Sequence, residues 1–446
     1  MSSNESNRAA SRIKESLMSF RLAIAFTNFG PYHLARLRAL ARSLADRGGE
    51  LVAHEVAGDE RKYPWTIERG SEPFRWVTLF PDRALESLTA GQCRAAMRAA
   101  LNRDRPEVVV TCGYSRPESQ AALNWAKHRG KPAVLMSESQ ELDHPRTAWK
   151  EWLKRQWVSR YDCALAGGPP HRDYLVKLGI PVDRIALGYN VVDNLDFVRG
   201  AGEARADPTT RVRLNIPPRP YFLCVSRFAT DKNLMTLIRC HAAHFRQVGP
   251  ERAWDLVLCG SGTPEGEAEV RRALEALPNE IAARIHLPGF VQGRTLQAWY
   301  AHASAFVLAS TLEPWGLVVN EAAACGLPLL VSNRVGAASV LVRPDVTGRV
   351  FDPYDEMGLT EALVWLTQME EPFRASLGRN AAALASQWGP ERFAQGTLEA
   401  LDAVGFPARS RVCVKAGSVL DSRPSAHFPT TIGSTAPRTL IQERSA

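Results

Sequence analysis

Length, composition and charge limit the classes of protein that this sequence can encode. The chain has 446 residues, of which 45% are hydrophobic and 23% charged, as in an ordinary globular protein. That length is too great for a single core, so we expect two domains of about 180 residues each, with tails. Lys and Arg outnumber Asp and Glu by 55 to 47, and the net charge of +8 suits phosphorylated ligands or an anionic membrane surface. We expect no nucleic-acid partner.

The cysteines and the apolar runs indicate the compartment. The eight cysteines are scattered, with no Cys/His cluster at the spacing of a zinc site, which is typical of a reducing cytosol. The apolar run from Leu22 to Phe26 is too short for the core of a signal peptide, and no run approaches the roughly 20 apolar residues that span a bilayer. We therefore expect a cytoplasmic protein that can associate peripherally with the inner face of the membrane.

Alternating strand and helix patterns predict two doubly wound parallel sheets. Residues 22–26 predict a buried strand, followed by a helix at 34–44 and a strand at 51–56. Residues 59–90, rich in Pro, Trp and charge, predict a loop insertion before the next strands. The predicted segments are a disordered N-terminus at 1–19, a first Rossmann-like domain at 20–199, a linker at 200–219, a second such domain at 220–385, a C-terminal helix at 386–405 and a disordered tail at 406–446.

A Trp-rich segment lies near the middle of the first predicted domain. Trp149, Trp152 and Trp157 fall on one face of a predicted helix, with basic residues around them. Two interpretations stay open. This face packs into the domain core, or it lies on the headgroup layer of a membrane.

The loop and helix at 309–328 carry the clearest chemical signal. Glu313 lies in a tight loop between Pro314 and a short apolar strand, and Glu321 lies in a helix that is apolar on nearly every face. An unpaired carboxylate buried there would cost several kcal/mol, so we expect polar groups to meet Glu321. The helix begins after Gly316, and its first N–H groups, near Leu317, predict an anion site.

These residues resemble a known family. Glu313-Pro-Trp-Gly followed by four residues and Glu321 is similar to the Glu-x7-Glu signature of retaining glycosyltransferases of the family-four type, the group 1 glycosyl transferases. The resemblance implies the GT-B fold, with an acceptor-side first domain, a donor-binding second domain and a C-terminal helix that crosses back to the first. It also implies that Glu313 holds donor-sugar hydroxyls and Glu321 the ribose hydroxyls of a nucleotide.

A second loop supplies two cations. Arg227 and Lys232 follow the first strand of the second domain, at the edge where open α/β sheets bind ligands. Arg227 offers a planar fork for phosphate oxygens, and Lys232 offers a compact charge. By resemblance this is the diphosphate-binding pair, and with Glu313 we assign these residues to catalysis.

A Gly-rich segment at 260–266 suggests a dinucleotide site, but its third Gly is one position late and the following strand ends without an acidic residue. It fits better as a loop beside a nucleotide, with Gly262 in contact. The segment Pro288-Gly289-Phe290-Val291 resembles the family segment whose backbone meets the base, which makes Phe290 a candidate for donor binding. Gly30 is expected to help stabilise the diphosphate.

The sequence therefore predicts a glycosyltransferase that moves a sugar from a nucleotide-diphosphate sugar to a glycan or lipid-linked acceptor, with no metal and no cofactor, and with retention implied by the resemblance alone. A nucleotide-sugar 2-epimerase and a non-catalytic nucleotide-sugar-binding protein stay open as alternative functions.

Many relatives carry a His beside the donor sugar, and here Tyr114 follows the corresponding strand. The candidates on the acceptor side are Tyr32, His33, Tyr114, Glu138 and His144.

Overall fold

The computed structural model describes residues 20–60, 67 and 70–406. The segments predicted as disordered at 1–19 and 407–446 lie outside the described residues. Phe406 is described, and its ring packs edge-on against Phe20 with the centroids 5.3 Å apart. The prediction that the disordered tail begins at Phe406 is therefore wrong at that residue.

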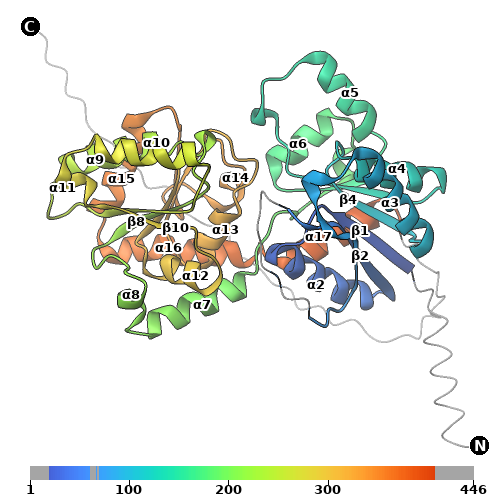
Figure 1. Cartoon of the computed structure of the whole chain (residues 1–446), viewed down its shortest axis with the longest axis horizontal. Helices are drawn as coiled ribbons and strands as arrows, with labels where there is room; N and C mark the ends of the chain where they lie inside the picture. Colours follow the sequence, from blue (N-terminus) through green and yellow to red (C-terminus); the bar gives the residue numbers. More distant parts are fainter. Residues whose placement is uncertain (1–19, 61–66, 68–69, 407–446) are drawn as a thin grey trace, which may run out of the picture. The chain divides into compact units, whose positions relative to one another are not determined.

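The first sheet has seven parallel strands in the order β3-β2-β1-β4-β5-β6-β7. Together with its helices it is called the first domain below (Figure 1). Its strands are β1 (Phe20–Phe26), β2 (Gly49–Asp59), β3 (Arg75–Ala84), β4 (Val108–Cys112), β5 (Ala133–Ser137), β6 (Cys163–Ala166) and β7 (Ile185–Leu187). Its helical segments are α2 (Pro31–Ala45), η1 (Leu85–Ser87), α3 (Ala90–Asp104), α4 (Pro117–His128), η2 (Glu141–Asp143), α5 (Ala148–Val158), α6 (Pro169–Lys177) and η3 (Val182–Arg184).

The second sheet has six parallel strands in the order β10-β9-β8-β11-β12-β13 and organises the second domain. Its strands are β8 (Tyr221–Val225), β9 (Asp255–Cys259), β10 (Ile285–Gly289), β11 (Ala305–Leu308), β12 (Leu329–Ser332) and β13 (Gly348–Phe351). The helical segments from α7 onward are α7 (Asn194–Ala206), α8 (Thr210–Arg213), η4 (Thr230–Lys232), α9 (Leu234–Val248), α10 (Pro264–Glu275), α11 (Asn279–Ala282), α12 (Gly293–His302), α13 (Leu317–Ala324), α14 (Ala338–Leu341), α15 (Glu356–Gln368), α16 (Glu371–Ser386) and α17 (Pro390–Ala403).

Alternation along the strands divides the first domain into two apolar layers. Leu22 and Ile24 pack with α2 on one face of the sheet, whereas Ala23 and Ala25 pack with α3 and α4 on the other. The last helix, α17, joins the α2 layer through Phe393 and lies against β6 and β7. The chain therefore ends its described part in the domain where it began.

Two segments expected to lack regular secondary structure form a strand and a helix. Residues 75–84, expected within a loop insertion, form edge strand β3, which pairs with β2. The linker expected at 200–219 is wrong over 200–206, because α7 runs through it, and α8 follows. Phe197, Ala201 and Ala204 recur at helical spacing and are buried in the core of the second domain, and the charged residues between them face outward.

The Trp-rich segment forms α5. Trp149 and Trp152 are 60% and 59% exposed, and Leu153 is 45% exposed, so packing of this face into the core is wrong for these residues. Trp157 is half-buried and packs against the α4 side of the first domain. Figure 1 shows α5 beside α6 at one margin of the domain.

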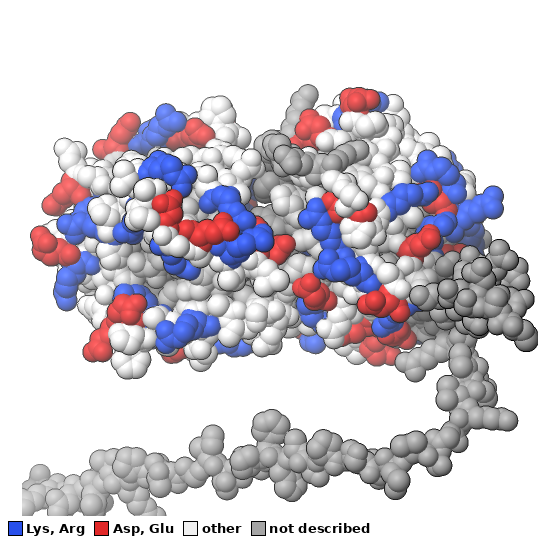
Figure 2. Space-filling view, turned by 90° about the horizontal axis from the view of Figure 1, so that it is seen from below, with Lys and Arg blue, Asp and Glu red and all other residues white. Residues whose placement is uncertain are grey.

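Charge and hydropathy of the described residues add two findings. No described helix is both long enough and apolar enough to cross a membrane. On the face drawn in Figure 2, basic and acidic side chains lie interspersed, so the positive excess is not gathered there into one field.

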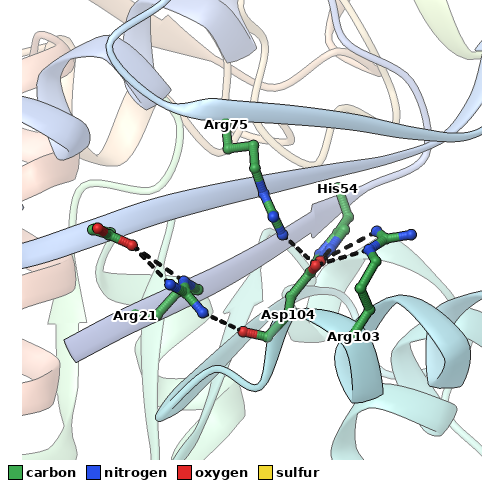
Figure 3. Close-up of polar contacts among 6 residues, drawn as sticks. Arg21, His54, Arg75, Arg103 and Asp104 are labelled. Carbon is green, nitrogen blue, oxygen red and sulfur yellow. Dashed lines mark hydrogen bonds and ion pairs between the residues drawn. The ribbon is translucent and has the colours of Figure 1, made fainter.

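A buried carboxylate ties the first sheet to α3. Figure 3 shows His54, Arg75 and Arg103 converging on Asp104, which is 1% exposed. His54 Nε2 lies 2.7 Å from one carboxylate oxygen and Arg103 Nε donates to the other at 3.0 Å. Burial alone would raise the pKa of Asp104, but the hydrogen bonds from these partners outweigh it and hold that pKa well below its usual value.

We predict that Asp104→Asn lowers the free energy of unfolding by about 2 kcal/mol at pH 7, because charge-assisted hydrogen bonds are lost. A depressed folded-state pKa stabilises the protein above the ordinary value of 3.8, and this contribution disappears as the pH falls below it. Urea unfolding at several pH values should therefore show the two proteins converging in acid. The control is Glu50→Gln, which removes an exposed ion pair with Arg21 and should change stability by about 0.5 kcal/mol or less.

Candidate functional site

The loop between β11 and α13 carries Glu313 and is held by the segment after β12. The carbonyl of Glu313 accepts a hydrogen bond from Gly336 N–H at 3.1 Å, and the carbonyl of Trp315 accepts one from Ala337 N–H at 2.9 Å. A Cβ on Gly336 would lie 2.0 Å from the Pro314 carbonyl oxygen, so this close approach needs glycine. The loop geometry is thus fixed by backbone packing.

Glu313 and Lys232, predicted from separate motifs, lie together. Lys232 Nζ is 2.8 Å from a carboxylate oxygen of Glu313 and 2.8 Å from one of Asp231. Thr311 N–H donates to the Asp231 carbonyl at 2.9 Å and joins the two loops. Burial raises the pKa of Glu313 against the attraction of Lys232. Burial alone would lower the pKa of Lys232, but the two carboxylates outweigh it and raise that pKa.

Arg227 lies at the carboxyl end of β8, and its side chain is exposed. Among the described residues, no hydrogen bond or ion pair of its guanidinium is found. Lys232 is buried and already balanced by Glu313 and Asp231. Of the two predicted phosphate ligands, Arg227 is therefore the one whose charge is available to an anion in this state.

The Gly-rich loop supports the Arg227 loop directly. Phe228 N–H donates to the Ser261 carbonyl at 2.8 Å, and a Cβ on Gly262 would lie 2.2 Å from the Phe228 carbonyl oxygen. A Cβ on Gly260 would lie 1.8 Å from the carbonyl oxygen of Ser226. These glycines are required by the close approach of two backbones, so contact with a nucleotide is not needed to explain Gly262.

Glu321 is buried in α13 and is met by two phenols. Its Oε1 accepts a hydrogen bond from Tyr32 of the first domain at 2.6 Å, and its Oε2 accepts one from Tyr300 of α12 at 2.9 Å. The residue is 1% exposed. Burial raises the pKa of Glu321, and the two hydrogen bonds oppose that rise. The polar partners expected for this carboxylate are therefore protein groups in this state.

The helix start near Glu321 has the expected backbone form. Gly316 precedes α13 with φ of 91°, in the region that favours glycine, and Leu317 is the first residue of the helix and half-buried. Phe290 follows β10 and is 53% exposed. Gly30 precedes α2, but its N–H donates to His33 Nδ1 at 2.9 Å and so is already engaged.

The loop of Glu313 is also a joint between the domains. Trp315 is 1% exposed and packs on the β6–α6 turn, where a Cβ on Gly167 would lie 3.0 Å from its ring. Its other neighbour is Trp388, stacked with ring centroids 6.3 Å apart. His171 Nε2 lies 2.7 Å from the Pro314 carbonyl oxygen. The sequence analysis missed His171, Tyr300 and Trp388.

A repeated motif explains the positions of two histidines, half-buried His33 and buried His171. Gly30-Pro31-Tyr32-His33 and Gly168-Pro169-Pro170-His171 each begin a helix with Gly as the capping residue and Pro in the first turn. In both, the His Nδ1 accepts the N–H of the capping Gly, at 2.9 Å and 3.0 Å. Because Nδ1 of His171 is an acceptor, its Nε2 carries the proton that is donated to Pro314. Gly-Pro-x-His is the sequence signal that could have identified His171.

The remaining acceptor-side candidates are dispersed. Glu138 is exposed after β5 and accepts a hydrogen bond from Asn190 Nδ2 at 2.7 Å, and its charge raises the pKa of Glu313. Tyr114 is half-buried, and burial followed by the charge of Glu151 on α5 raises its pKa, which associates it with α5 and not with Glu313. His144 is exposed, and it makes no hydrogen bond or ion pair with the described residues. Glu138 is thus the predicted acceptor-side carboxylate whose charge acts on Glu313.

The second half of the chain matches a known family. Residues 207–384 match the model described as "Glycosyl transferases group 1". A D-inositol 3-phosphate glycosyltransferase from Xylanimonas cellulosilytica is 30% identical over 253 residues, which are 55% of this chain and 58% of that protein. The chain spans about half the length of the curated relatives that it matches. The match confirms the resemblance drawn from Glu313 and Glu321.

Solved structures share the fold over most of the chain. Sucrose-phosphate synthase from Thermosynechococcus elongatus aligns with a TM-score of 0.65 at 21% identity, over 86% of this chain and 99% of that one. A UDP-forming α,α-trehalose-phosphate synthase from Burkholderia xenovorans aligns with a TM-score of 0.67 at 14% identity, over 86% and 99%. These likenesses confirm the predicted GT-B fold.

We predict that His33 acts on stability and does not titrate as a catalytic group. Burial lowers its pKa from 6.5 to about 3. The unfolded chain therefore takes up a proton near pH 6.5 and the folded protein does not. The contribution of His33 to the free energy of unfolding is fully present above pH 6.5 and is lost as the pH falls toward 3. Between pH 7 and pH 5 this loss amounts to about 2 kcal/mol. In His33→Gln, urea unfolding should lose this part of the pH dependence.

The matched control is His144→Gln, because His144 is exposed. Its pH dependence of unfolding should equal that of the parent protein. An unchanged pH dependence of unfolding in His33→Gln would contradict the assignment of a neutral imidazole with a lowered pKa.

Proposed function

Because residues 207–384 match the family model of the group 1 glycosyl transferases, we propose that this protein transfers a sugar from a nucleotide-diphosphate sugar to a hydroxyl acceptor. The observation that carries the proposal is the meeting of Glu313 and Lys232 at 2.8 Å. They come from loops after neighbouring strands, β11 and β8, at the sheet edge where such folds bind ligands. One has the chemistry to hold sugar hydroxyls and the other to hold phosphate.

The cations would stabilise the leaving group. Breaking the anomeric bond transfers negative charge to the diphosphate, and fixed cations lower the energy of that transition state. Arg227 can bind two phosphate oxygens with its planar fork. Lys232 would turn from Glu313 and Asp231 toward the diphosphate when the donor enters. With this charge supplied by side chains, we propose that transfer requires no metal ion, and the family signature leads us to propose retention of configuration.

The carboxylates would orient the donor. Glu313 would accept hydrogen bonds from sugar hydroxyls, and Glu321 from ribose hydroxyls, each worth about 1.5 to 3 kcal/mol when charge-assisted. Phe290 has an exposed ring that can contact the base. Glu138, whose charge acts on Glu313, is our candidate for a contact with the acceptor hydroxyl. The acceptor is proposed to be a glycan, a lipid-linked sugar or a phosphorylated polyol like the one named for the inositol phosphate relatives.

The test is a transfer assay with UDP-, GDP-, ADP- and dTDP-sugars after a thermal-shift screen for the donor. Arg227→Ala should lower kcat/KM by about 10²-fold, as expected for one lost transition-state contact, with an unchanged melting temperature because the side chain is exposed. Lys232→Ala should lower both kcat/KM and the melting temperature, since it leaves Glu313 without its cation.

Arg219→Ala is the matched control, because Arg219 is an exposed arginine just before β8, at the opposite end of that strand. It should retain full activity, and EDTA should leave turnover unchanged. Equal activity of the Arg227 and Arg219 variants would reject the leaving-group role. Steady turnover of the nucleotide sugar without release of free nucleotide would favour a 2-epimerase.

We also propose that α5 contacts an anionic membrane surface. Trp149, Trp152 and Leu153 are exposed on one helix, and Leu142 beside it is 59% exposed. Lys150 and Arg155 on α5 are exposed as well. Exposed Trp side chains bordered by basic residues are typical of a surface that lies at the level of lipid headgroups.

We predict that Trp152→Ser weakens binding to vesicles of phosphatidylglycerol and phosphatidylcholine by about tenfold in a sedimentation assay, because the apolar area inserted into the interface is lost. Phe373→Ser is the control, since Phe373 on α16 is 64% exposed and lies in the other domain. Equal loss in both variants, or no binding by the parent protein, would reject the membrane proposal.

A further inference from the structure

The two phenols on Glu321 come from different domains. Tyr300 belongs to α12, is fully buried, and also lies 3.4 Å from the Val318 carbonyl oxygen in α13 itself. Tyr32 belongs to the first turn of α2 in the first domain and is half-buried. Its bond to Glu321 spans 289 residues of sequence. Tyr300 therefore holds the carboxylate from within the second domain, and Tyr32 links it to the first domain.

In this arrangement both carboxylate oxygens of Glu321 are engaged and shielded from a ligand. Each carboxylate oxygen of Glu321 already accepts a hydrogen bond from a phenol, and the residue is 1% exposed. Because Glu321 is almost inaccessible, a ligand hydroxyl can reach its carboxylate only if one of the two phenols withdraws. Tyr300 is enclosed within its own domain, whereas Tyr32 reaches Glu321 from the first domain, so Tyr32 is the group that can withdraw.

We propose that the Tyr32 hydroxyl occupies the position of a ribose hydroxyl on Glu321, and that a bound nucleotide displaces it. This inference rests on the proposed function, because it takes the ligand of Glu321 to be the ribose of a nucleotide. Tyr32 then competes with the nucleotide for Glu321. The hydrogen bond between Tyr32 and Glu321 must break before a ribose hydroxyl can donate to the same carboxylate. The apparent donor affinity equals the intrinsic affinity multiplied by the fraction of protein in which Tyr32 has released Glu321.

Displacement of Tyr32 also breaks the hydrogen bond between α2 and α13. Two contacts of the joint do not involve Tyr32: His171 on the Pro314 carbonyl, and Trp315 against Gly167. The loop of Glu313 would stay attached to the first domain while the first turn of α2 is released. Nucleotide binding would therefore change the α2 start, which lies at the carboxyl end of β1, and leave the Glu313 loop in place.

The test is calorimetric titration with UDP, GDP, ADP and dTDP on the whole chain. In Tyr32→Phe the competing hydroxyl is absent, while the nucleotide-bound state, from which Tyr32 has withdrawn, is unchanged. The nucleotide that binds the parent protein should bind this variant about tenfold more tightly. Tyr300→Phe is the matched control, since it removes the other phenol from the same carboxylate but no competitor, and it should bind the nucleotide equally or more weakly.

Inorganic pyrophosphate separates competition from a general change. It can reach Arg227 but has no ribose, so it should bind the parent and Tyr32→Phe equally. Hydrogen exchange of the parent protein supplies a second readout: amides in the first turns of α2 should exchange faster with nucleotide than without, whereas a Tyr32 that merely supports the site would leave them equally or better protected.

Each remaining outcome has a defined meaning. Weaker nucleotide binding in Tyr32→Phe, or unchanged binding together with unchanged exchange of α2, would overturn the competitor role and leave the proposed function intact. An equal gain for pyrophosphate would also overturn it. Failure of the parent protein to bind any of the four nucleotides would overturn both this inference and the proposed function.

Discussion

The structure depends on one electrostatic constraint, the burial of a carboxylate in an apolar helix. Glu321 lies in α13 among valine and alanine side chains and is almost inaccessible to water, where an unpaired charge would cost several kcal/mol. Two phenols meet it, one from within its domain and one from outside. The requirement to satisfy this single group therefore links the composition of α13, the placement of α12 and the contact between α2 and α13.

The loop that precedes this helix combines chemistry with mechanical attachment. Glu313 faces Lys232, whereas the next two residues face the first domain: Pro314 accepts a hydrogen bond from His171, and Trp315 fills the space left by Gly167. Of these three consecutive residues, Glu313 therefore belongs to the candidate site, whereas Pro314 and Trp315 contact the first domain. A displacement of the first domain is transmitted to the Glu313 backbone through neighbouring peptide bonds, without a chain of intervening side chains.

Local patterns predicted much of this molecule, and contacts between distant segments account for the rest. Buried strands and helical periodicity predicted two parallel sheets, and the spacing of Glu313, Glu321, Arg227 and Lys232 predicted the site, of which the structure directly pairs Glu313 with Lys232. The sequence could not show that Tyr32 meets Glu321, because nothing local relates residues 289 positions apart. His33 has the residue type of a catalytic group, yet the backbone N–H of Gly30 engages its Nδ1. Residues 200–206 were misjudged because their outward charges resemble a linker, although Ala201 and Ala204 bury a helical face.

The position of α17 has a consequence for the order in which the chain acquires its structure during synthesis. Phe393 and Leu401 complete the apolar layer on the α2 side of the first sheet, and Phe406 covers Phe20 at its edge. The ribosome therefore releases the first sheet long before the residues that seal it, and the whole second domain is made in between. N-terminal domains generally fold first during synthesis. This layer is an exception, because its packing is completed only when nearly the last described residue has been made. A nascent chain stalled before residue 390 would leave that apolar face open, where chaperones could bind it.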